Sequence, residues 1–79
     1  MINMNIKDFV SNFELQFDDV EEGTMTSNII YKNIPEWSSL TALLIIAMVD
    51  SEYDVTLTGD SIRNTTTIQE LFDIVASKK

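Results

Sequence analysis

Residues 36–49 read EWSSLTALLIIAMV, and this stretch decides the fold that the sequence predicts. Its apolar run from Leu40 to Val49 is too short to cross a bilayer and is typical of a helix inside a bundle. Ser38 or Ser39 is expected to cap this helix, which ends near residues 50–52. Because the run is apolar nearly all round, the pattern fits either complete burial under the preceding loop or one apolar side at the surface. A chain of 79 residues builds only one modest core, so we infer that one side stays exposed.

The segment before this helix predicts another helix and a long loop. Apolar residues at helical spacing predict a helix from about Asn5 to Phe17, capped by Asn3 or Asn5. Leu15 lies off that apolar stripe and is expected to pack on the following loop. Residues 18–36 predict the loop itself, with a short turn of helix inside it, and Tyr31 is expected at the edge of the core.

The C-terminal third of the chain predicts two more helical segments. An extended connector follows the long apolar helix, and one short helical turn is expected within residues 58–63. Thr67 and Glu70 fit a capping box, in which each side chain bonds the other residue's backbone N–H, at the start of a last helix. The sequence therefore predicts an all-α fold, a small four-helix bundle with three main helices, one short helix and a long first loop. Residues 1–79 form one domain.

Composition narrows the classes of function. Acidic residues outnumber basic ones by 13 to 5, giving a formal charge of −8, which repels nucleic acid and anionic membranes and favours basic partner surfaces. The chain has no cysteine and no histidine, which removes disulfides, the usual zinc sites and the commonest general base. An enzyme that works alone is therefore disfavoured. Residues 1–8 lack the layout of a signal peptide, so we expect a soluble, cytoplasmic protein. A monomer is the default expectation for its oligomeric state.

The segment Trp37-Ser38-Ser39-Leu40, with the length, the acidity and the predicted helix order, resembles the acyl carrier protein family. Those proteins are small acidic helical bundles in which an Asp-Ser-Leu signature opens the second helix. Their serine carries 4′-phosphopantetheine, whose thiol holds an acyl or aminoacyl group. The resemblance covers nearly the whole chain and implies that Ser39 is the attachment residue and Leu40 the leucine of the signature. Ser38 stands where the family usually has aspartate, and it is the alternative attachment residue.

The resemblance implies a carrier that serves partner enzymes. Its cargo would be acyl intermediates of fatty-acid or of specialised lipid or polyketide-like biosynthesis. Its partners would be a phosphopantetheinyl transferase and acyl-transfer and condensing enzymes. Since the long helix carries no charge before Asp50, docking is expected to use its apolar residues Leu40, Leu43, Leu44 and Ala47. Two alternatives stay open, an aminoacyl or peptidyl carrier and an unmodified helical module for protein interaction.

The resemblance also implies that the bundle interior can shelter an acyl chain. The lining would be apolar and drawn from three predicted helices: Ala42, Ile45, Ile46, Val49, Ile62 and Leu71. An ordinary filled core is the favoured alternative, because protein interiors are close-packed. The acids at residues 50–54, with Asp60, lack the ligand spacing of a calcium loop and are expected to be solvated.

Overall fold

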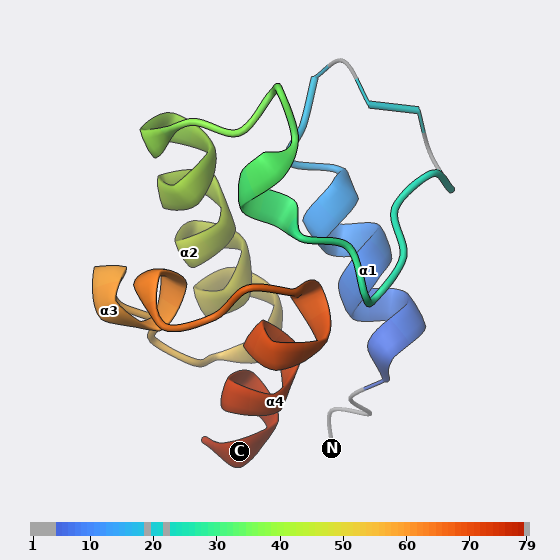
Figure 1. Ribbon diagram of the computed structural model, residues 1–79. Coiled ribbons are helices and arrows are strands. Elements are labelled where there is room, and N and C mark those ends of the chain that lie inside the picture. The colour runs from blue at the N-terminus through green and yellow to red at the C-terminus, as the bar shows by residue number, and fades with distance from the viewer. Residues whose placement is uncertain (1–4, 19, 22, 79) are drawn as a thin grey trace.

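The computed structural model describes residues 5–18, 20–21 and 23–78. Four α-helices are present, and the described residues contain no strand (Figure 1). The predicted all-α bundle, with three main helices, one short helix and a long first loop, is confirmed. A 3-10 helix lies inside that loop, as the expected short turn. The helices are α1 (Ile6–Glu14), η1 (Tyr31–Asn33), α2 (Ser39–Tyr53), α3 (Gly59–Arg63) and α4 (Ile68–Ser77).

Helix α1 is shorter than its apolar pattern predicts. It ends at Glu14 rather than near Phe17, and Leu15 is its C-cap residue. Asn5 caps the start by accepting the Asp8 N–H at 3.1 Å, whereas Asn3 lies outside the described residues. The expectation for Leu15 is wrong, because its side chain is 70% exposed instead of packed on the loop. Leu15 lies off the stripe that turns Phe9 and Phe13 toward the core, so it faces solvent.

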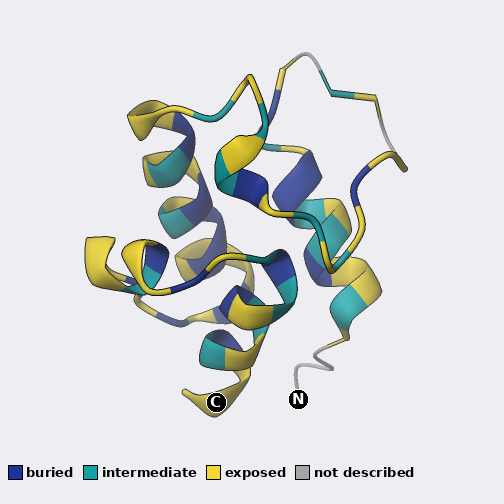
Figure 2. Ribbon diagram, viewed as in Figure 1, coloured by how far each residue is buried: buried dark blue, intermediate teal, exposed yellow. Residues whose placement is uncertain are grey.

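Helix α2 has one buried and one exposed side, although both are apolar. Ser38 is its N-cap, and Asp54 closes its end in the left-handed conformation at φ 55°. Figure 2 shows buried positions on the inward side of α2 and exposed ones outward. The inference of an exposed apolar side is therefore confirmed. The buried residues of α2 are Thr41, Ile45, Met48, Val49 and Tyr53.

An aromatic cluster fills the centre of the bundle. The Phe9 ring lies 5.5 Å from that of Tyr53 and 5.3 Å from that of Phe72, joining α1, α2 and α4. Tyr31 in η1 packs 5.3 Å from Phe13 and is fully buried, so its predicted place at the core edge is wrong. Burial of Tyr31 is possible because its hydroxyl donates to a main-chain carbonyl, that of residue 62, at 3.2 Å.

The long first loop is held by two hydrogen bonds to a buried carboxylate near its N-terminal end. The Glu14 carboxylate, only 5% exposed, accepts the Gly23 N–H at 2.7 Å and the Met25 N–H at 2.8 Å. Gly23 has a φ of +88°, a conformation that glycine adopts without strain. Further along, the Gln69 N–H donates to the Ser27 carbonyl at 2.8 Å. The loop is thus anchored to both α1 and α4. These bonds explain how a compact domain can contain so long a loop, which is uncommon.

Helix α3 lies within residues 58–63, where one short turn is expected, and α4 begins with the predicted cap. The Thr67 hydroxyl accepts the Glu70 N–H at 3.2 Å, and the Glu70 carboxylate accepts the Thr67 N–H at 3.1 Å. This is the predicted capping box. Within the described ranges, no helix is both long and apolar enough to cross a membrane.

Candidate functional site

Ser39 is the first residue of α2 and is exposed to solvent. The neighbouring Ser38 has a different task, because its hydroxyl accepts the Thr41 N–H at 3.2 Å and lies 3.1 Å from the Thr41 hydroxyl. The Thr41 hydroxyl in turn donates to the Glu36 carbonyl at 3.4 Å. The start of α2 is therefore fixed by Ser38 and Thr41, and the Ser39 hydroxyl is not needed for it.

The environment of Ser39 suits a phosphate ester. The first backbone N–H groups of a helix point outward without helical partners, and the helix dipole makes this end partly positive. In α2 the Ser38 hydroxyl satisfies the N–H of Thr41, and the first turn contains no acidic residue. An anion attached at Ser39 would therefore meet N–H groups and no adjacent carboxylate within that turn. The first turn of α2, with its outward N–H groups and no acidic side chain, therefore fits the phosphate of a phosphopantetheine arm attached at Ser39.

An exposed apolar surface continues from Ser39 along the helix. Leu40 is 66% exposed, Leu43 63% and Leu44 40%, and Ala47 is exposed as well. These four residues follow the i, i+3, i+4, i+7 spacing of one helix face, and we call them the α2 apolar face. They are the four residues that the sequence predicts for partner binding. Contiguous exposed apolar patches mark the places where a protein surface contacts other molecules.

A small hollow adjoins the same end of α2. It has a volume of about 230 Å³ and lies between the end of α1 and the first turn of α2. We call it the α1–α2 hollow. Its lining combines apolar, hydroxyl and carboxylate side chains: Gln16, Phe17, Asp18, Glu36, Ser38, Leu40, Thr41 and Leu44.

The predicted acyl shelter is occupied by packed side chains. Ile45, Val49 and Leu71 are fully buried and Ile62 is 7% exposed, while Ala42 and Ile46 pack against the same core. Two larger hollows, of about 470 and 410 Å³, lie along the first loop, and none of the six predicted residues lines them. The arrangement favours the filled core over an interior shelter.

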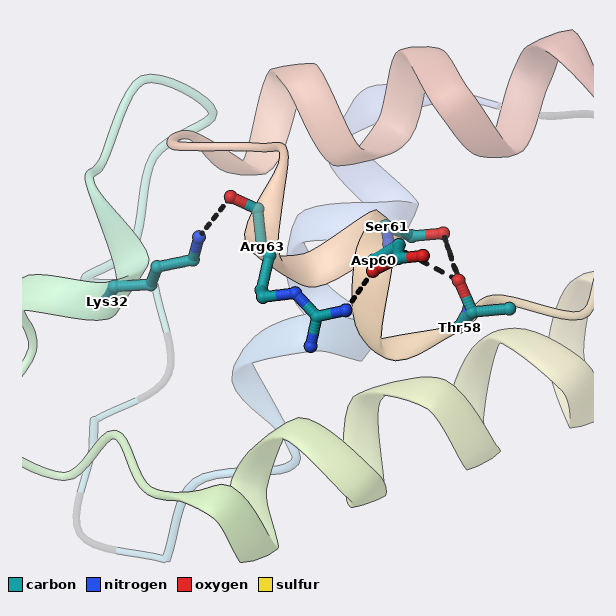
Figure 3. Close-up of polar contacts among 5 residues, drawn as sticks. All are labelled: Lys32, Thr58, Asp60, Ser61 and Arg63. Carbon is teal, nitrogen blue, oxygen red and sulfur yellow. Dashed lines mark hydrogen bonds and ion pairs between the residues drawn. The ribbon is translucent and has the colours of Figure 1, made fainter.

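A second cluster of polar side chains surrounds α3, and the hydrogen bonds within it give these side chains a structural role. Figure 3 shows Thr58 bonded to Ser61 across the first turn and Arg63 paired with Asp60. The Lys32 ammonium also donates to the Arg63 carbonyl at 3.2 Å, which ties η1 to α3. These bonds stabilise α3, a helix of only five residues. Within the part of the chain that the structure describes, no three acidic side chains gather where they could hold a metal ion.

Sequence reasoning missed two residues that shape the site. Thr41 is buried near the start of the apolar run, where its hydroxyl completes the cap network. Glu14 is buried at the end of α1 and holds the loop that leads to α2. Neither role has a reliable local signal in the sequence, since Glu14 is nine residues from Gly23 along the chain.

Comparison of the chain with protein-family models, with curated proteins and with solved structures gives no match. Function is therefore inferred from the residues and geometry of the site.

Proposed function

We propose that this protein is an acyl carrier protein whose Ser39 hydroxyl is the attachment point of a 4′-phosphopantetheine arm. The observation that carries the proposal is the exposure of Ser39 at the first residue of α2, directly beside the α2 apolar face. The residue order Trp37-Ser38-Ser39-Leu40 and the helical bundle support it. The carrier would hold acyl intermediates of fatty-acid or of specialised lipid or polyketide-like biosynthesis.

In this function Ser38 and Thr41 would stabilise the start of α2, and Ser39 would present its hydroxyl to the modifying enzyme. Ser38 and Thr41 keep the helix start in place, so a bond formed at the Ser39 oxygen leaves the cap intact. The N-terminal N–H groups of α2 would stabilise the phosphate charge. When attached, the arm supplies the thiol that the sequence lacks, on which an acyl group is held as a thioester.

The α2 apolar face would bind the partner enzymes, namely a phosphopantetheinyl transferase and acyl-transfer and condensing enzymes. Leu40 and Leu43 are both more than half exposed, and their burial would contribute a favourable apolar term of about 25 cal/mol for each Å² removed from water, against which the costs of association count. Docking beside the tether keeps the cargo at a high effective concentration in each partner's active site. The carrier positions its cargo and need not catalyse a reaction.

Loading of the arm tests the proposal directly. Incubation with coenzyme A, magnesium and a broad-specificity phosphopantetheinyl transferase is expected to add about 340 Da to the intact protein, the mass of one arm. Ser38→Ala is expected to gain the same mass, because Ser38 serves only as the cap. Ser39→Ala is expected to gain none. Loading of Ser39→Ala but not of Ser38→Ala would move the attachment to Ser38, and an unchanged wild-type mass would refute the proposal.

The second candidate is an unmodified helical module for protein interaction. It is favoured by Ser38, which leaves the residue before Ser39 without the usual carboxylate, and by an apolar face that needs no arm to bind a partner. Intact-mass measurement of the protein from its native host separates the two candidates. An arm at Ser39 supports the carrier, and an unmodified chain bound to a partner through α2 supports the module.

A further inference from the structure

The α2 apolar face is uncharged and is complementary to itself when a second copy is turned end for end. The sequence has no charged residue at positions 39–49, which include the whole face. Consider two antiparallel α2 helices whose two-fold axis passes between positions 43 and 44. In this register Leu43 of each copy lies opposite Leu44 of the other copy, and Leu40 lies opposite Ala47. A large side chain therefore meets a small one at both ends of the face, so the two helices can approach closely.

The two ends of α2 differ in charge, and the antiparallel register brings unlike ends together. Asp50 and Glu52 are exposed acids in the last turn of α2, whereas its first turn contains no acid. Asp50 continues the exposed stripe seven residues after Leu43, so in this register it lies over the helix start of the other copy. There it meets the partly positive end of the helix dipole. A parallel pair would instead place the acids of the two copies against each other.

We propose that the α2 apolar face binds a second copy of this chain, in an antiparallel pair with two-fold symmetry. The pair needs no arm at Ser39 and goes beyond the proposed function, with whose partner enzymes it competes for the same face. The contact over residues 40–50 is only about 15 Å long, at 1.5 Å per residue, so the pair belongs with small, transient interfaces. Repulsion between two chains of charge −8 weakens it further. A dissociation constant of about 0.1 mM is expected, which leaves monomers dominant in dilute solution.

Sedimentation equilibrium of the unmodified chain measures the pair, in about 0.5 M sodium chloride to screen the repulsion. The weight-average mass of wild type is expected to rise with concentration from 9.0 kDa toward twice that value. Leu43→Glu places two carboxylates beside the two-fold axis and is expected to keep the monomer mass up to about 1 mM. Leu15→Glu is the matched control, because Leu15 is 70% exposed and Leu43 63%, and it is expected to associate as wild type does. Wild type that stays at the monomer mass, or equal loss of association in both variants, overturns the inference.

Disulfide trapping tests the register. The chain has no cysteine, so Leu40→Cys and Ala47→Cys each carry a single thiol. An equal mixture of the two variants is oxidised with oxidised glutathione, and intact mass identifies which chains become joined.

Disulfides between unlike variants are expected to predominate, because a disulfide needs Cα atoms within about 7 Å and the register places position 40 opposite position 47. An excess of disulfides between like variants would indicate a parallel pair, and about half of each kind would indicate random collision. Either result overturns the antiparallel pair and leaves the carrier function standing. A wild-type chain that accepts no arm would overturn the carrier function and leave the pair standing.

Discussion

Replacing Glu14 by glutamine tests how the long first loop is held. The carboxylate accepts two backbone N–H groups, one on each oxygen, at 2.7 and 2.8 Å. Glutamine keeps one oxygen and sets an NH₂ group against the other N–H, so one of the two bonds is lost. Hydrogen bonds to charged groups contribute about 1.5–3 kcal/mol each. Because the Met25 bond is buried and the Gly23 bond is part-buried, the amide most favourably keeps its oxygen on the Met25 N–H and sets its NH₂ group against the Gly23 N–H, while Glu14 itself is only 5% exposed.

The expected loss is therefore about 1.5–3 kcal/mol in the free energy of unfolding. A domain of this size has a total stability of about 4–12 kcal/mol, so the variant loses a large share of it. The melting temperature is expected to fall by about 10 °C, since each kcal/mol shifts it by about 4–8 °C in a domain of 60–100 residues.

Thermal and urea unfolding followed by circular dichroism would measure the effect of Glu14→Gln. Glu21→Gln is the matched control, because it makes the same chemical change at an exposed position of the same loop. Its melting temperature is expected to stay within about 2 °C of wild type, as surface substitutions usually do. If the two variants melt together, the buried carboxylate does not hold the loop and the reasoning fails.

Three further predictions concern the caps and the core. Ser38→Ala is expected to destabilise the fold by about 1 kcal/mol in urea unfolding and Ser38→Asp by close to zero, since aspartate caps as well as serine; equal losses would contradict the cap. The Thr66 and Thr67 N–H groups hold the pKa of Glu70 below its ordinary 4.5. The stabilisation by Glu70 is therefore present above pH 4.5 and is lost as the pH falls through the lowered pKa. On acidification the melting temperature of wild type should fall more than that of Glu70→Gln, whose side-chain carbonyl still accepts both N–H bonds. Melting temperatures that fall in parallel with pH in the two proteins would refute this. Burial raises the pKa of the Tyr31 hydroxyl, and Tyr31→Phe, which loses its bond to a buried carbonyl, should cost about 1 kcal/mol in the same urea assay, with an unchanged midpoint as the contrary result.

The helices and their caps could be predicted because they depend on residues close together in the chain. Thr67 and Glu70 are three residues apart, and the cap that they predict is the one observed. Ser38 likewise caps α2 through a residue three positions on. The apolar pattern predicts too late an end for α1, because Phe17 belongs to the apolar stripe but reaches the core from the turn beyond the helix. Local pattern sets where a helix forms more reliably than where it ends.

By itself the sequence determined an acidic, all-α bundle with a long first loop and a serine at the start of its most apolar helix. Periodicity alone leaves open which side of that helix faces water, because it gives no direction when both sides are apolar, and only the family resemblance points to Leu40, Leu43, Leu44 and Ala47. The tertiary structure decided this by packing Ile45 and Val49 against the other helices while Leu40 and Leu43 stay exposed. It also brought the Glu14 carboxylate to the loop. Such contacts depend on the positions of segments distant along the chain, which only the packing of the whole fold fixes.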